Sequence, residues 1–239
     1  WPGLAVGQFA LCTGPAFASS NVFRIVIRGK GAHAAMPHNG IDPVPAACQM
    51  VQAFQNILTR NKHPLDTGVI SVTKIHAGEA VNVVPDDCVV EGTVRTFTNE
   101  VLELIERRMK TIAEATCAAF EAQCEFEFRR QYPATVNHVA ETDFARRVLG
   151  EVVGAKNVLD FRPTMGAEDF SYFLQAIPGC YFLIGNGDGE HREGGHGLGP
   201  CMLHNPSYDF NDDLIPLGGS AWVRIAEAWL AGPLRGASR

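Results

Sequence analysis

The feature that most constrains the fold of this chain is its hydrophobic period, which switches between two and about 3.6 residues in a fixed order. Segments of period two alternate apolar and polar side chains, as half-buried strands do. The others place apolar side chains three or four positions apart, as amphipathic helices do. The order is strand, helix, strand, strand, helix, strand, at residues 22–28, 43–58, 69–76, 88–97, 102–120 and 124–129. This βαββαβ order predicts a ferredoxin-like unit, an antiparallel sheet with two helices on one face.

Local signals mark where these helices begin. Asp42 precedes Pro43, which predicts Asp42 as the N-cap and Pro43 as the first helical residue. Asn99 is predicted to cap the second helix. Together the six segments indicate a self-contained domain at residues 20–132.

Helical segments alternate with short apolar strands after Pro133, which is α/β layering. Helices are expected at residues 142–153, 168–176 and 214–230, and strands at residues 4–11 and 181–184. These are too few strands for a complete doubly wound sheet. We therefore expect an incomplete α/β domain made of residues 1–19 and 133–239, with residues 20–132 inserted in it. Trp1 in place of Met favours a chain that begins inside a larger protein.

The composition is that of an ordinary globular protein, with 239 residues, 46% hydrophobic and 19% charged. A net charge of -6 without a basic cluster argues against nucleic-acid binding. No apolar run approaches the roughly 20 residues that cross a bilayer, so no membrane partner is expected. The seven cysteines are scattered, with no CxxC, which favours a reducing compartment, most simply the cytoplasm.

One histidine is presented as a metal ligand would be. His204 lies at the edge of a Gly-rich loop, is held by Pro206, and precedes the carboxylates of Asp209 and Asp212. His33 lies far away in sequence among glycines and alanines that leave its ring exposed. Together the two histidines indicate metal-dependent hydrolysis, although a catalytic metal needs about three protein ligands and this chain offers one persuasive candidate.

Six motifs resemble one enzyme family in its own order. They are WPGLAVG at 1–7, GKGAHAAMPH at 29–38, VNVVPD at 81–86, GTVRTF at 92–97, GAEDF at 166–170 and the His204 segment. Across almost the whole chain the sequence resembles the hippurate hydrolase, aminoacylase and indole-acetyl-amino-acid hydrolase family. These are two-metal amidohydrolases of the aminoacylase-carboxypeptidase type.

The resemblance implies an α/β metallohydrolase catalytic domain with a two-metal site, and a ferredoxin-like satellite domain through which the protein forms a homodimer. The metals would be two divalent ions per protomer, zinc, manganese or nickel, and the substrate an N-acyl amino acid. Most metal ligands of the family precede the point that matches Trp1, so the chain resembles the C-terminal part. His204 is the one ligand carried over, and we expect the chain alone to hold little metal and to be inactive.

The family pattern also assigns roles in the satellite domain. His33 would cross the dimer interface into the partner's active site and stabilise the oxyanion by donating a hydrogen bond. The alternative is a loop histidine packed against its neighbouring alanines. For His204 the alternative is a loop histidine bonded to backbone. His191 and His196 share its Gly-rich loop and are more simply explained as solvent-exposed side chains.

Substrate-binding roles fall on three further residues. Arg95 could hold a substrate carboxylate bidentately and Asn82 could bond the substrate backbone. The alternatives are a surface arginine paired with Glu91 and a turn-forming asparagine. Glu168 would lie in the substrate cleft, although a carboxylate is also favoured there if Glu168 and Asp169 open a helix.

Two rivals to N-acyl amino acid hydrolysis remain open. The chain could be a dimerisation or binding module without catalysis, or the enzyme could be a peptidase or an N-acyl-diaminopimelate-type deacylase. For the dimer contact, residues 69–76 are a candidate edge strand that could pair with its twin across a two-fold axis. The contact between subunits would be either a continuous sheet or a pair of helices from this domain.

Overall fold

The computed structural model describes residues 1–195 and 197–232, which form two compact units. The first unit is Trp1–Ala16, Val136–Thr164 and the chain from Tyr172 onward. The second unit is Phe17–Thr135 together with Met165–Ser171. The chain therefore leaves the first unit, builds most of the second and returns.

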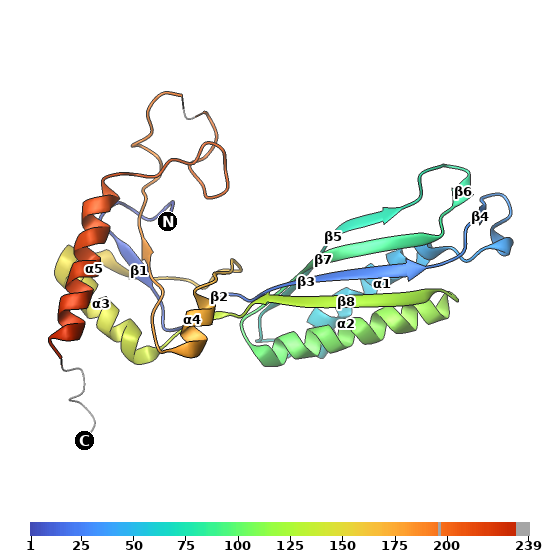
Figure 1. Cartoon of the computed structure of the whole chain (residues 1–239), viewed down its shortest axis with the longest axis horizontal. Helices are drawn as coiled ribbons and strands as arrows, with labels where there is room; N and C mark the ends of the chain where they lie inside the picture. The colour runs from blue at the N-terminus through green and yellow to red at the C-terminus, as the bar shows by residue number, and fades with distance from the viewer. Residues whose placement is uncertain (196, 233–239) are drawn as a thin grey trace, which may run out of the picture. The chain divides into compact units, whose positions relative to one another are not determined.

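The second unit has the ferredoxin-like fold that the sequence predicts. Its sheet has the order β5-β7-β3-β8, and every neighbouring pair is antiparallel. Helices α1 and α2 both lie on one face of it (Figure 1). The elements are β3 (Ser20–Arg28), α1 (Pro43–Asn56), β5 (Gly68–Ala77), β7 (Asp87–Thr96), α2 (Asn99–Ala119) and β8 (Gln123–Tyr132).

The two helices begin at side-chain caps, one of which differs from the prediction. Asp42 accepts a hydrogen bond from the Val44 amide, 2.9 Å away, as expected for the N-cap of α1. The cap of α2 is Thr98, not Asn99: Thr98 is extended, and its hydroxyl accepts from the Val101 amide at 3.3 Å. Asn99 lies inside the first turn, because only the residue before it has the extended backbone that a cap requires.

The core of this unit lies between the sheet and the two helices. Each strand contributes the apolar members of its alternation, and each helix contributes one apolar stripe. The fully buried residues include Ile25, Ile27, Met50, Phe54, Val90, Val94, Ile105 and Met109. The opposite face of the sheet is polar, and it carries Arg24, Glu91 and Thr93.

The first unit contains a short mixed sheet of order β10-β1-β11. β1 (Phe9–Leu11) runs parallel to β10 (Val158–Asp160) and antiparallel to β11 (Leu183–Ile184). Helices α3 (Val139–Val153) and α5 (Leu214–Leu230) enclose its core, where Leu149 and Ala221 are buried. This is the incomplete α/β layer that the sequence predicts, with shorter strands than expected and with β10 in addition.

One predicted helix begins three residues later than expected. Helix α4 is Ser171–Ala176, whereas the sequence predicted a helix from residue 168. The Glu168 carbonyl accepts hydrogen bonds from the Ser171 amide and hydroxyl, at 3.3 and 2.7 Å. Glu168 and Asp169 therefore form the turn that leads into the helix and do not open it.

Four short strands and three short turns of helix complete the described residues. β2 (Gly14–Phe17) pairs with β9 (Thr135–Asn137), and β4 (Ala32–His33) pairs with β6 (Val83–Val84). The helical turns are Pro37–Asn39, Ile57–Asn61 and Ala155–Asn157. Over residues 1–195 and 197–232, no helix has the length and apolar composition needed to cross a membrane.

Gly92 should be the least replaceable residue of the sheet. A Cβ built on Gly92 would lie 2.0 Å from the Ser71 carbonyl oxygen and 2.6 Å from the ring of Phe23. Because the nearer atom belongs to the backbone, Gly92→Ala should destabilise the fold by about 1–3 kcal/mol in a chemical denaturation measurement. Gly219→Ala is the matched control, since nothing lies within 4 Å of its Cβ. Because Gly219 lies in a helix, its replacement by alanine should stabilise the fold by about 0.5–1 kcal/mol. Equal effects of the two changes would contradict the close packing around Gly92.

Candidate functional site

The predicted metal ligand His204 has a strained backbone. It is one of two non-glycine residues with positive φ in the part of the chain that the structure describes, at 62°. An L-residue in this left-handed region costs about 1–2 kcal/mol, so such a residue persists only where its surroundings hold it. Its side chain is exposed and has no hydrogen-bond partner among the described residues. The loop therefore presents a free imidazole on a constrained backbone.

Arg192 holds the chain around His204 in place. Its guanidinium donates to the carbonyls of Gly199 and Ser207, at 2.8 and 3.1 Å. The Asn205 side chain accepts from the Ser207 amide at 2.9 Å, next to His204 itself. Charge-assisted bonds of this kind are roughly twice as strong as neutral ones. Sequence reasoning missed Arg192, because it acts through backbone carbonyls and belongs to no motif.

Asn186 fixes the next part of the same segment. Its side-chain amide donates to the Asp209 carbonyl at 3.0 Å and accepts from the Asn211 amide at 2.9 Å. His191 also bonds the Asp209 carbonyl through Nε2, at 3.1 Å. Burial is the main cause that raises the pKa of Tyr208 above its usual value. His196 lies outside the described residues.

The chemistry of the donor set limits what this segment can hold alone. Within residues 1–195 and 197–232, no group of three or more His, Cys, Asp or Glu side chains could hold a metal ion. His204 is a single imidazole, and a catalytic metal requires about three protein ligands. The described residues therefore do not form a metal site by themselves.

The structure brings His33 and Asn82 together at one end of the four-stranded sheet. β4 and β6 lie beyond the Arg28 end of β3 (Figure 1), with His33 opposite Val83. The Ala34 amide donates to the Asn82 carbonyl at 3.0 Å. Both side chains are exposed, on neighbouring segments. These two predicted site residues thus lie on adjacent segments at the same end of the sheet.

One hydrogen bond fixes the donor nitrogen of His33. The Ala35 amide donates to Nδ1 of His33 at 3.0 Å. Nδ1 must therefore be unprotonated, and in a neutral ring the proton lies on Nε2. Because the side chain is exposed, the Nε2 proton is accessible to a ligand from outside the unit.

Arg95 lies at the other end of the same sheet. Eight residues along β7 separate it from Asp87 at the Arg28 end, which at about 3.3 Å per residue is about 26 Å. Its alternative partner is engaged elsewhere: Glu91 pairs with Arg24 at 3.6 Å and with Lys74 at 3.3 Å. Arg95 has no ion pair with any described residue.

Glu168 is half-buried and belongs to the short segment Met165–Ser171, which joins the second unit. Its backbone carbonyl caps the start of α4, as described above.

Among the predicted site residues, the structure brings His33 and Asn82 together. It leaves Arg95 at the opposite end of their sheet, and His204 belongs to the other unit.

Known proteins resemble this chain over most of its length. Residues 19–121 match a family described as peptidase dimerisation domain. The N-acetyl-L-cysteine deacetylase of Bacillus subtilis is 40% identical, over 90% of this chain and 48% of its own length. The IAA-amino acid hydrolase ILR1-like 4 of Arabidopsis thaliana is 34% identical, over 95% of this chain and 51% of its own length.

A solved structure is also similar to this chain over most of its length. A dinuclear metal binding peptidase from the M20 family of Bacillus subtilis has a TM-score of 0.73 and 27% identity. The match covers 95% of this chain and 54% of that one. This chain thus spans about half the length of the curated relatives it matches.

The strain at His204 can be measured without any ligand. His204→Gly and His204→Ala both remove the imidazole, but only glycine adopts a positive φ without steric cost. We expect the glycine variant to be more stable than the alanine variant by about 1 kcal/mol, measured by thermal unfolding. Equal stability of the two variants would show that the left-handed backbone at this position is not strained.

Proposed function

Because the chain belongs to the M20 amidohydrolase family, we propose that the protein that carries it hydrolyses the amide bond of N-acyl amino acids. The two curated relatives reported above are a deacetylase and an amino acid conjugate hydrolase, and both names describe cleavage of an N-acyl bond. The observation that carries the proposal is the exposed pair of His33 and Asn82 in a unit matched to a dimerisation domain.

His33 is proposed to act in the partner's active site. Its Nε2 carries the proton of a neutral ring, because Nδ1 accepts from Ala35. A hydrogen-bond donor at the developing oxyanion is typically one of the largest contributions to acyl transfer. Within the unit that contains it, His33 has Asn82 on the neighbouring segment, whereas Arg95 lies near the opposite end of the sheet. We therefore propose that His33 needs a second subunit to reach the rest of a site.

Arg95 is proposed to bind the substrate carboxylate. Its guanidinium lacks an ion-pair partner among the described residues, and a planar guanidinium matches a carboxylate bidentately. Asn82 is proposed to bond the substrate's amide, and Glu168 to lie in the substrate cleft. A homodimer through the second unit is part of this proposal, because it supplies each site with residues of both subunits.

A divalent metal is proposed as cofactor, two ions per protomer, with zinc, manganese or nickel as candidates. The solved relative is described as dinuclear metal binding. His204 is the one described residue that we propose as a ligand. Because the described residues form no metal site alone, we expect these 239 residues by themselves to bind little metal and to lack activity.

Peptide hydrolysis is the second candidate, since the same solved relative is described as a peptidase. The two candidates differ in the group on the acyl side of the bond. The test is to compare the rates at which the complete polypeptide hydrolyses hippurate and acetyl-amino acids with the rates for simple dipeptides. Faster hydrolysis of the first group would favour N-acyl amino acids, and faster hydrolysis of the dipeptides would favour a peptidase.

Subunit mixing tests the role of His33 directly. In the complete polypeptide, His33→Ala and His204→Ala should each abolish most activity. After the two variants are mixed and their subunits exchanged, half of the dimers are mixed, and one of the two sites in each has both histidines. We therefore expect recovery to about a quarter of wild-type activity.

The control is each variant taken alone through the same exchange procedure, which should recover nothing. If His33 served its own subunit, neither site of a mixed dimer would be complete. Failure of the mixture to recover activity, with mixed dimers present, would therefore contradict the proposal.

A further inference from the structure

Two cysteines of the second unit lie on either side of one turn. Cys117 is in the last turn of α2, and Cys124 is the second residue of β8. Both are free thiols in the structure, and the proposed function uses neither of them. Whether two such thiols can react with each other depends on how closely the fold holds the two sulfur atoms.

The turn between α2 and β8 is fixed by two backbone hydrogen bonds. The Ala122 amide donates to the Cys117 carbonyl at 2.9 Å, and the Glu121 amide donates to the Ala118 carbonyl at 3.1 Å. These two bonds form a Schellman motif, whose left-handed position is usually a glycine. Here Glu121 occupies it with a φ of 60°. The chain therefore reverses directly after Cys117, and β8 begins beside the end of α2.

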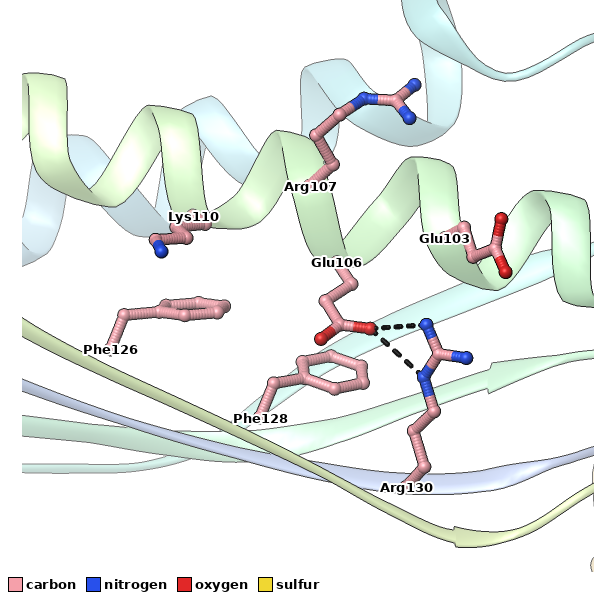
Figure 2. A pocket seen from close by; sticks show the side chains of 7 residues that line it. All are labelled: Glu103, Glu106, Arg107, Lys110, Phe126, Phe128 and Arg130. Carbon is pink, nitrogen blue, oxygen red and sulfur yellow. Dashed lines mark hydrogen bonds and ion pairs between the residues drawn. The ribbon is translucent and has the colours of Figure 1, made fainter.

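Both cysteine side chains lie between α2 and β8. Cys117 continues the buried stripe of α2 after Ala113 and is 1% exposed. Phe126 and Phe128 of β8 point toward α2 (Figure 2). Cys124 shares their side of the strand, because residues two positions apart in a strand point the same way. It is half-buried and packs against the same core as Cys117.

One ion pair sets the register of α2 against β8. Arg130 pairs with Glu106 at 2.8 Å (Figure 2). From Glu106 to Cys117 the helix advances about 17 Å, at about 1.5 Å per residue. From Arg130 back to Cys124 the strand covers about 20 Å, at about 3.3 Å per residue. Because the chain turns back between the two elements, these similar lengths place the two cysteines at the same level.

The two thiols are joined by a hydrogen bond. This bond is the main cause that lowers the pKa of Cys124 and raises the pKa of Cys117. Burial and the carboxylates of Glu114 and Glu125 act in the opposite direction on Cys124, and the hydrogen bond outweighs them. Opposite shifts of this kind mean that the Cys117 thiol donates to a Cys124 thiolate. The thiolate is the nucleophilic form, and Cys124 is also the more exposed of the two cysteines.

We propose that Cys117 and Cys124 form a site of reversible oxidation, at which a small hydroperoxide converts the two thiols into a disulfide. Cys124 reacts with the oxidant, since it is the sulfur that solvent can reach. Cys117 then resolves the product from within the core. Hydrogen peroxide is the simplest oxidant of this class. The reaction requires neither the metal nor the substrate of the proposed function.

The first step consumes one peroxide molecule. The Cys124 thiolate attacks a peroxide oxygen, so that an S–O bond forms and the O–O bond breaks. The hydroxide that leaves takes up the proton that Cys124 had released to solvent, and Cys124 is left as a sulfenic acid.

The second step closes the disulfide. The Cys117 sulfur attacks the Cys124 sulfur, the S–S bond forms and the S–O bond breaks. The hydroxide leaves as water with the Cys117 proton. In sum, the two thiols lose two electrons and two protons, and one hydrogen peroxide is reduced to two waters.

The position of Cys117 favours the disulfide over further oxidation. A sulfenic acid that meets no thiol is oxidised further to a sulfinic acid, which is not readily reversed. Cys117 is already within hydrogen-bond reach of Cys124, so the second step requires no reagent from solvent. A small thiol that attacks the more exposed sulfur, Cys124, would restore both thiols by exchange.

Peptide mapping tests the site in the wild-type protein. Trypsin releases residues 111–129 as one peptide with both cysteines, because no Lys or Arg lies between Lys110 and Arg129. The folded, complete polypeptide is treated with hydrogen peroxide, its free thiols are alkylated, and the peptides are analysed by mass spectrometry. We expect the 111–129 peptide to lose two hydrogens and to escape alkylation, and reduction by dithiothreitol to restore alkylation at both cysteines.

Cys48 is the internal control. It is exposed, has no hydrogen bond to another thiol among the described residues, and is the one cysteine of the tryptic peptide 31–60. The 111–129 peptide should be oxidised about tenfold faster than the Cys48 peptide, since its reacting sulfur carries more thiolate. Oxidation of Cys48 before any disulfide forms in the 111–129 peptide would overturn the proposal.

Two variants test the order of the steps. Cys117→Ala removes the resolving thiol, so a sulfenic acid should accumulate at Cys124 and be labelled by dimedone. Cys124→Ala removes the reacting sulfur, so the buried Cys117 should remain unlabelled. Equal dimedone labelling of the remaining cysteine in the two variants would also overturn the proposal. Thermal unfolding checks that both variants are folded, and the wild-type mapping decides the question if either is not.

Discussion

The length of one antiparallel sheet is the constraint on which this account depends. Its four strands fix His33 and Asn82 beyond one end and Arg95 near the other, and the span of β7 from Asp87 to Arg95 alone is about 26 Å. A packed sheet with two helices on its core face cannot bend enough to close that distance. A site that uses both groups therefore needs two copies of the sheet. The homodimer proposed above supplies the second copy.

The second element of the account is local strain held by a hydrogen-bond network. Around the positive φ of His204, Arg192 bonds the carbonyls of Gly199 and Ser207 on the two sides, and Asn186 fixes the chain further along at Asp209. Their side-chain hydrogen bonds go to the backbone and not to the imidazole. They set the direction of the chain, and the chain sets the direction of the ring. In the proposed function this rigidity holds a metal ligand in place before any metal binds.

Much of the fold could be predicted from the hydrophobic period, because burial on one face determines the period directly. The ferredoxin-like order followed from the period and the Asp42 cap from the Pro43 that follows it, and both are confirmed. The errors concern local competition between neighbouring residues: Thr98 caps α2 in place of Asn99, and α4 begins at Ser171 and not at Glu168. β10 was missed because a strand of three residues has no measurable period.

The site was less accessible to sequence reasoning. His33, Asn82, Arg95, Glu168 and His204 came from motifs, and their roles remain proposals. Arg192 and Asn186 could not be found in this way, since each acts on backbone carbonyls that any sequence would supply.

The measurement that tests the central claim most directly is zero-length cross-linking of carboxylates to amines in mixed dimers of nitrogen-14 and nitrogen-15 chains. Lys110 and Glu114 of one chain, 3.9 Å apart, provide an internal control within every subunit. We predict additional links between a light chain and a heavy chain, with both linked residues in the second unit, because the proposed homodimer forms through that unit. Links within single chains alone, with no link between a light chain and a heavy chain, would contradict the proposed homodimer.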